Sequence, residues 1–290
     1  VTPGGVTPSG VTPGGVTPGG VTPVGVLVID DPFNTLPSLG EPHENAVIDV
    51  LKKYAPDAAV SHYDLNFGGG DGKLPVLTAT GDNSLDKQID SWSTLPGDSA
   101  AILADALSKN PNTKVINTSW GANKLGLYDN LYTGVINPDN TDLNNPQSVT
   151  TLATQLGIPA STIEGVRTEF ANYRAGGSTD PAVFKALSST KNSIELQNAL
   201  AKYTDSRLNA PDSVFSKGLE TYQKTTKLLS DNGIAVVASY GNSGDGYGSW
   251  TYNQYKEGSP DSEVNYMAMS DNVISVAAST DNNPNGTITD

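Results

Sequence analysis

The stretch Val26-Leu27-Val28-Ile29-Asp30-Asp31 decides the fold predicted for this chain. Four consecutive apolar residues, three of them β-branched, are typical of a strand covered on both faces, and two carboxylates stand where that strand ends. Soon after, His43 opens an amphipathic run that stops before Pro56, and its predicted apolar side comprises Ala46, Val47, Val50, Leu51 and Tyr54. A carboxylate at a strand end and a histidine at a helix start can meet above one edge of a sheet.

Alternating strand and helix patterns continue along the chain. Further strands are predicted at 57–65, 115–121, 234–238 and 273–278, and the longer helices at 99–110 and 213–232. This alternation predicts a three-layer, mainly parallel α/β sheet with helices on both faces. In such sheets ligands bind beyond the carboxyl ends of the strands. Four polar residues stand at these ends: Asp30, Asp31, Ser119 and Asn242.

Two segments do not follow this alternation. Residues 1–25 repeat Val-Thr-Pro-Gly-Gly with small variations, and because each unit carries proline and lacks apolar mass, we expect a flexible linker. Residues from about 122 to 212 show helical spacing and helix-start signals, among them Ser161-Thr162-Ile163-Glu164, which has the pattern of a capping box. We interpret this second segment as a mostly helical insertion packed beside the sheet.

Composition excludes several classes of protein. The net charge of −14 argues against a nucleic-acid partner, which requires a basic face. The absence of cysteine excludes disulfides and thiol catalysis, and without a run of about 18 apolar residues no membrane span is expected. No signal peptide is visible, so the sequence is interpreted as a mature or trimmed form of a secreted or cell-surface protein.

Taken in order, the motifs resemble those of subtilisin-like serine proteases. Val28-Ile29-Asp30 is similar to the strand that bears the catalytic aspartate of that family, and His43-Glu44-Asn45-Ala46-Val47 to its histidine helix. Two further segments resemble the strand that lines the substrate cleft and the strand that leads to the oxyanion asparagine: Val115 to Gly121 and Val236 to Asn242. The resemblance spans most of residues 24–278, and implies a catalytic domain over 26–290 that is incomplete at its C-terminal end.

The resemblance implies a role for each catalytic residue. Asp30 would accept a hydrogen bond from His43 and fix its tautomer, and His43 would act as general base and then as general acid. The side-chain amide of Asn242 would donate to the developing oxyanion. The nucleophile serine of the family follows the strand at 273–278 at some distance, so we expect it beyond Asp290 and expect residues 1–290 alone to be inactive.

The resemblance also implies a substrate site and few accessory groups. Ser119, Trp120 and Gly121 would offer backbone groups to an extended peptide, and the pocket for the side chain before the cut bond would be walled by Ala238, Ser239 and Tyr240. No cofactor is required, and structural calcium in acidic loops is an expectation at the level of the family. The partner is then a peptide or protein substrate.

Several departures leave other interpretations open. Pro32 replaces the glycine that the family usually has two residues after its aspartate, and Glu44-Asn45-Ala46 replaces its usual Gly-Thr-His. The alternatives are a non-catalytic subtilisin-like module that binds peptides or partners and, further away, an unrelated doubly wound hydrolase or nucleotide binder. Judged one at a time, without the order of the motifs, Asp30 and Asn242 would be interpreted as turn residues and His43 as a surface histidine. His62 is interpreted as structural.

Overall fold

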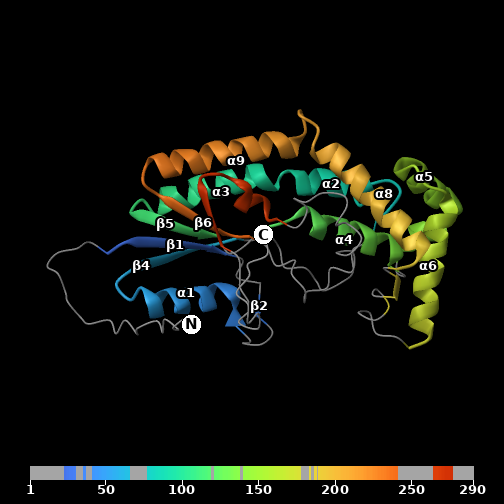
Figure 1. The fold of residues 1–290 in the computed structure, drawn as a ribbon, viewed down its shortest axis with the longest axis horizontal. Helices are drawn as coiled ribbons and strands as arrows, with labels where there is room; N and C mark the ends of the chain where they lie inside the picture. Colours follow the sequence, from blue (N-terminus) through green and yellow to red (C-terminus); the bar gives the residue numbers. More distant parts are fainter. Residues whose placement is uncertain are drawn as a thin grey trace, which may run out of the picture.

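The computed structural model describes residues 23–30, 35–36, 41–65, 77–118, 121–137, 140–177, 183, 186–187, 189–240 and 264–276, with the backbone alone at 35–36 and 41–43. In this part of the chain a five-stranded, all-parallel sheet lies between helices (Figure 1). The predicted three-layer α/β class is therefore confirmed.

The sheet has the strand order β4-β1-β5-β6-β7, so the first strand of the chain lies inside the sheet. The strands are β1 (Gly25–Asp30), β4 (Ala59–Asp64), β5 (Thr113–Thr118), β6 (Ala235–Ser239) and β7 (Val273–Val276). A separate antiparallel pair consists of β2 (Thr35–Leu36) and β3 (Glu41–Pro42). The order reverses direction at β1, because the chain first moves outward to β4 and then returns to β5 on the other side.

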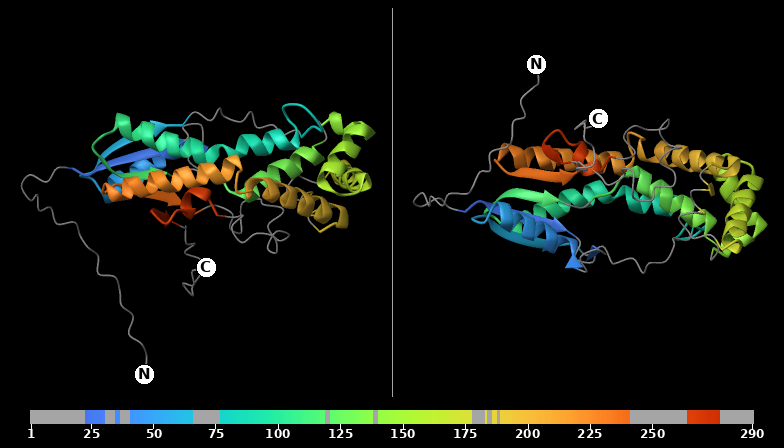
Figure 2. Two further views of the ribbon diagram at one scale, coloured as in Figure 1. Left: turned by 90° about the horizontal axis from the view of Figure 1, so that it is seen from above. Right: turned by 60° about the horizontal axis from the view of Figure 1, so that its bottom comes forward.

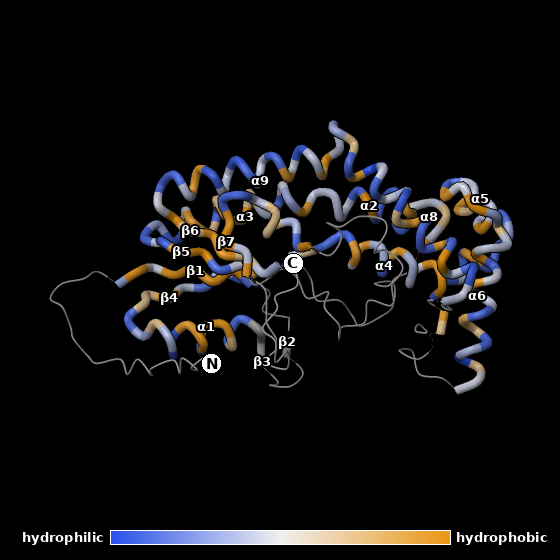
Figure 3. Tube along the Cα trace, viewed as in Figure 1, coloured by the Kyte–Doolittle hydropathy of each residue, from blue (hydrophilic) through white to orange (hydrophobic). Residues whose placement is uncertain are grey.

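Helices cover the two faces of the sheet unequally. Helix α1 (His43–Tyr54) lies on one face, whereas α3 (Leu95–Lys109) and α9 (Val214–Asp231) lie side by side on the other (Figures 1 and 2). In β1, Leu27 and Ile29 join Leu103 of α3 in the main hydrophobic core. The alternate residues of β1, ending in Asp30, therefore point to the face of α1. Figure 3 shows the apolar character of β1, β5 and β6 between these layers.

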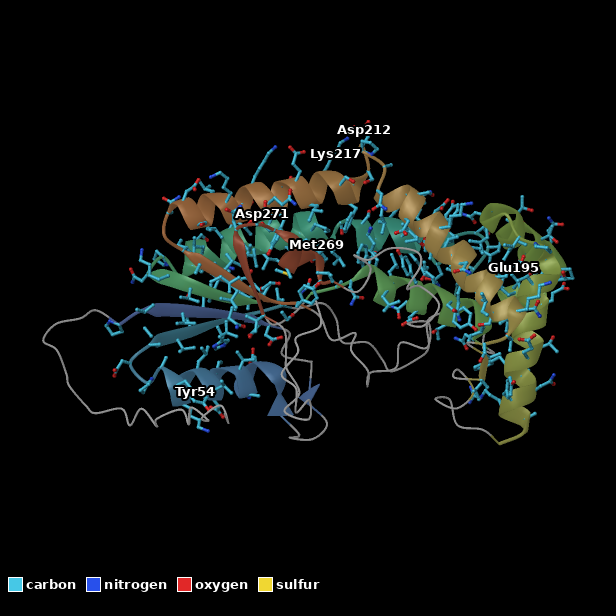
Figure 4. All side chains as sticks on the ribbon, in the orientation of Figure 1. Tyr54, Glu195, Asp212, Lys217, Met269 and Asp271 are labelled. Carbon is cyan, nitrogen blue, oxygen red and sulfur yellow. The ribbon has the colours of Figure 1, made fainter. Side chains whose placement is uncertain are left out.

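Helix α1 is rotated relative to the prediction. Val50 and Tyr54 are 56% and 75% exposed, and Tyr54 lies on the outer side of the helix (Figure 4), so their assignment to the buried side is wrong. The partly buried row at i, i+3, i+4 and i+7 is instead Glu44, Val47, Ile48 and Leu51. The apolar residues alone could not reveal this rotation, because the row that faces the sheet begins with a carboxylate.

Beyond the carboxyl-terminal edge of the sheet lies an extension of helices (Figures 1 and 2). The described residues between Gly121 and Asp212 form helices and no strand: α4 (Lys124–Ile136), η1 (Asp142–Asn144), α5 (Pro146–Leu156), α6 (Ala160–Ala175) and α8 (Lys191–Leu208). Buried residues of the sheet and of these helices belong to one continuous hydrophobic cluster. The helical extension therefore shares its core with the sheet.

The predicted capping box in this extension is wrong. Helix α6 begins at Ala160, and its N-cap is Pro159, which makes no side-chain cap. Thr162 instead donates a hydrogen bond of 3.1 Å from Oγ1 to Glu195 Oε2 of α8. The proline that precedes the helix fixes the chain before Ser161 is reached, so the hydroxyl and carboxylate lie inside the first turns and are used for tertiary contact.

Helix α2 (Leu85–Ser93), which the sequence did not indicate clearly, ties the extension to the sheet layer. Asp86 accepts hydrogen bonds from Arg207 at 2.9 Å, Tyr203 at 2.8 Å and Gln155 at 3.0 Å. Arg207 also donates to Asp90 at 2.7 Å. These contacts join α2 to α5 and α8 by partly exposed polar groups. No helix among the described residues is long and apolar enough to cross a membrane.

Two glycines allow α3 and α9 to approach closely. A Cβ atom added at Gly218 would lie only 2.9 Å from the backbone nitrogen of Gly97, whereas one added at Gly97 would lie 3.7 Å from the nearest atom, the Cα of Gly218. The first contact is too short and involves backbone, which cannot rotate away. The second is an ordinary van der Waals distance. The two positions are therefore chemically identical but sterically different.

We expect Gly218→Ala to destabilise the protein and Gly97→Ala to be tolerated. Overpacking lowers the free energy of unfolding by about 1–3 kcal/mol. The higher helix propensity of alanine offsets about 1 kcal/mol of this loss at most. Thermal unfolding followed by circular dichroism should show Tm lower by roughly 2–6 °C for Gly218→Ala and unchanged or slightly higher for Gly97→Ala. Equal Tm values for the two variants would contradict the close approach at Gly218.

Candidate functional site

The candidate site lies at the carboxyl ends of the central strands, on the side of the helical extension. Because β1, β5 and β6 are neighbours in the sheet, their last residues Asp30, Thr118 and Ser239 come together at one edge. Of the predicted site residues, Asp30, Gly121, Ala238, Ser239 and Tyr240 are described, and His43 is described by its backbone. Asp31, Ser119, Trp120 and Asn242 lie outside the described residues.

Asp30 is fully buried where β1 ends. It is paired in register with Asp64 of β4 and belongs to the sheet face on which α1 lies. Helix α1 begins at His43, so the backbone of the second predicted catalytic residue stands at the start of the helix over this face. The hydrogen bond between the Asp30 and His43 side chains remains a prediction, because the side chain of His43 lies outside the described part.

A second histidine and two more carboxylates surround this strand end. His62 and Asp64 are on the same face of β4, with 3.8 Å between His62 Nε2 and Asp64 Oδ1. Both side chains are more than half exposed, at 57% and 56%. The interpretation of His62 as a structural histidine stays a prediction, and its side chain lies on the surface of the sheet rather than inside it. Glu44, from the first turn of α1, completes the group on the sheet-facing side of that helix.

Glu44 is the member of this group whose ionised form is disfavoured by its surroundings. Its Oε2 atom is buried and has no hydrogen-bond partner among the described residues. Burial raises the pKa of the Glu44 carboxyl above its ordinary value, and the nearby Asp64 carboxylate raises it further. His62 acts in the opposite direction, and Asp30 adds a smaller rise. Sequence reasoning missed Glu44 as a site residue, although its position directly after His43 was the available signal.

The other half of the edge, at β5 and β6, is held together by neutral hydrogen bonds. Tyr240 N–H donates to the Val276 carbonyl at 2.8 Å, and Asn265 N–H donates to the Tyr240 carbonyl at the same distance. The Asn265 side chain donates from Nδ2 to the Ser239 carbonyl at 2.9 Å. Of the three residues predicted to wall the pocket, Ala238 lies in the hydrophobic core, whereas Ser239 and Tyr240 are partly or largely exposed at this edge. Asn265 had no sequence motif to mark it.

Two other kinds of site would be a metal centre and a pocket away from the strand ends. Among the described residues, no group of three or more histidine, aspartate or glutamate side chains could hold a metal ion. A pocket of ≈ 780 Å³ lies between α6 and α8 in the helical extension, lined by residues that include Thr162, Lys191 and Glu195. Figure 4 shows Glu195 well away from the sheet, so this pocket is separate from the strand ends.

Comparisons with known proteins identify no relative. No protein-family model, no curated protein and no solved structure matches the chain.

We expect Glu44→Gln to stabilise the protein at neutral pH. Since the folded state raises the pKa of this carboxyl, the stability it contributes is fully present below the ordinary pKa of glutamate and is lost as the pH rises through the raised value. Glutamine imitates the protonated acid at every pH. Thermal unfolding should therefore give a higher Tm for Glu44→Gln than for the wild type at pH 7, and nearly equal values at pH 4.

The matched control is Glu164→Gln, which changes an exposed glutamate of α6. Its Tm should follow that of the wild type at both pH values. A lower Tm for Glu44→Gln at pH 7 would mean that the ionised carboxylate of Glu44 is stabilising, which contradicts the expected effect of burial and of Asp64.

Proposed function

We propose that this chain is the catalytic domain of a serine-type endopeptidase in which Asp30 orients His43. The observation that supports the proposal most directly is the place of Asp30. It is fully buried at the carboxyl end of an interior strand, on the sheet face over which α1 begins with His43. A carboxylate excluded from water accepts a hydrogen bond from an imidazole strongly, and stabilises the imidazolium that forms during proton transfer.

In the proposed reaction, His43 takes the proton of a serine hydroxyl as the oxygen attacks the peptide carbonyl carbon. The side-chain amide of Asn242 donates a hydrogen bond to the oxyanion that results. His43 then gives the proton to the leaving amine, and water repeats the sequence to release the acid. We assign no serine among the 290 residues to the nucleophile role. The tests therefore use the longest natural polypeptide that carries this sequence.

The strand order supports a substrate path across the same edge. The exits of β5 and β6 are neighbours, and the residues 265–266 join them, since Asn265 donates to the carbonyls of Ser239 and Tyr240 and Tyr266 donates to that of Ala122. An extended peptide bound to the backbone of such a segment would bring its scissile bond toward the end of β1. The competing proposal is a module that binds peptides at this edge without cleaving them.

We expect His43→Ala and Asp30→Asn each to abolish peptide cleavage. Because the members of such a site act together, loss of either should lower kcat by about 10³-fold or more. The sequence contains two histidines, so His62→Ala is the matched control and should retain activity. Asp49→Asn, which changes an exposed aspartate of α1, is the control for Asp30→Asn. Cleavage of a quenched-fluorescence peptide library, scored by mass spectrometry, provides the measurement.

Three outcomes separate the proposals. Cleavage by the wild type that is lost in both variants and retained in both controls supports the endopeptidase. Peptide binding without cleavage by the wild type supports the binding module and overturns the catalytic role. Cleavage that is lost in His62→Ala but retained in His43→Ala would show that His62, and not His43, is the catalytic histidine. That result would overturn the proposed arrangement.

A further inference from the structure

The pocket of ≈ 780 Å³ between α6 and α8 belongs to the helical extension, away from the sheet (Figure 4). Its two walls are joined by hydrogen bonds between side chains. Glu169 of α6 accepts from Thr190 at 2.6 Å and from Asn192 at 2.8 Å. Further along, Thr162 of α6 donates to Glu195 of α8 at 3.1 Å. Earlier residues of one helix thus meet later residues of the other, so the helices run antiparallel and their contacts fix the walls of the pocket.

Two charged side chains in the pocket wall stand one helical turn apart. Lys191 and Glu195 are four residues apart on α8, a spacing that commonly gives an ion pair. Lys227 and Asp231 of α9 have the same order of charges and form such a pair at 2.9 Å. The Lys191 ammonium, in contrast, has no ion-pair or hydrogen-bond partner within the described ranges. The Glu195 carboxylate turns to α6 instead, where Oε2 accepts from Thr162 and Oε1 is left for another donor.

Uncharged polar groups complete one face of the pocket. Lys191, Ile194, Glu195 and Asn198 follow the i, i+3, i+4 and i+7 positions of α8, so they lie on one side of that helix. Ser161 faces them from the start of α6. In the part of the chain that the structure places, neither the Asn198 amide nor the Ser161 hydroxyl is engaged in a hydrogen bond. The pocket therefore offers a cation, a carboxylate and two uncharged polar groups to a ligand.

We propose that this pocket binds a free α-amino acid with an uncharged polar side chain, with the ligand carboxylate at Lys191 and the ligand ammonium at Glu195. A simple anion would be repelled by Glu195, and a simple cation by Lys191. One carbon atom separates the two charged groups of an α-amino acid, so they fit between side chains whose Cβ atoms are about 5–6 Å apart. Asn198 and Ser161 would then hydrogen-bond the ligand side chain. This site is independent of the proposed peptidase reaction.

The test uses L-glutamine as the probe and the longest natural polypeptide that carries this sequence. Isothermal titration calorimetry should show one site with a Kd of about 10 mM or tighter. Two analogues each lack one charge: glutaramate has no amino group, and γ-aminobutyramide has no carboxylate. Each should bind at least about fivefold more weakly than glutamine, as expected for the loss of one partly exposed ion pair. Inorganic phosphate should not compete with glutamine.

Two variants assign the charges to their side chains. Lys191→Gln should weaken glutamine binding at least about fivefold and leave the binding of γ-aminobutyramide unchanged, because that analogue has no carboxylate to lose. Glu195→Gln keeps an acceptor for Thr162, and should weaken glutamine binding but not the binding of glutaramate. Lys202→Gln and Glu164→Gln change exposed residues of the same two helices outside the pocket, and should bind all three ligands as the wild type does.

Failure of this inference differs from failure of the proposed function. Absence of glutamine binding overturns it, as does binding that is equal in the wild type and in folded Lys191→Gln and Glu195→Gln variants. Glutaramate or phosphate binding as tightly as glutamine would show an anion site and would also overturn it. The analogues are compared on the wild type, so a variant that fails to fold leaves this comparison intact. Peptide cleavage enters none of these measurements, so loss of the peptidase proposal leaves the outcome unchanged.

Discussion

The pairing of β1 with parallel neighbours on both of its edges is the constraint on which the other features depend. Its backbone groups are shared between β4 and β5, and its side chains are buried on both faces. This placement forces the chain to leave β1 toward α1 on one face and to return over the other face with α3. It also buries Asp30 at the strand end, because the alternation that puts Leu27 and Ile29 into the core assigns Asp30 to the face of α1.

The edge formed by the strand ends has two halves of different character. Around β1 and β4 it carries carboxylates, where burial, Asp64 and Asp30 each raise the pKa of Glu44 and the exposed His62 lies beside Asp64. Around β5 and β6 the hydrogen bonds of the described residues are between neutral groups, and the side-chain amide and backbone N–H of Asn265 satisfy the carbonyls of Ser239 and Tyr240. Proton transfer requires titratable groups within hydrogen-bond reach of the reacting atoms, whereas peptide alignment requires rigid hydrogen-bonding groups. In the proposed reaction, the half at β1 and β4 would take part in proton transfer, and the half at β5 and β6 would align the peptide.

Regular periodicity made much of the fold predictable. Helix α9 follows its predicted span closely, with Ser213 as N-cap and Gly233 in a left-handed conformation after its end, because strong local signals and a buried stripe agree there. The rotation of α1 was not predictable, since a carboxylate takes a place on its sheet-facing row. The position of Asn265 was not predictable either. Its side chain lies against Gly121 and donates to the Ser239 carbonyl, and both residues are far from it in sequence and adjacent to it only in the folded protein.

The two outer strands of the sheet differ in how they discourage association. At β4 the side chains of His62 and Asp64 put polar and ionisable groups along the edge. At β7, Ile274 and Val276 are 55% and 51% exposed, and no described strand pairs with its outer side. Natural sheets usually protect such edges with charge, proline or a covering segment, because unpaired backbone groups beside apolar side chains are a template for added strands. Within the described part of the chain, β7 therefore offers the more apolar edge to an added strand and β4 the more polar one.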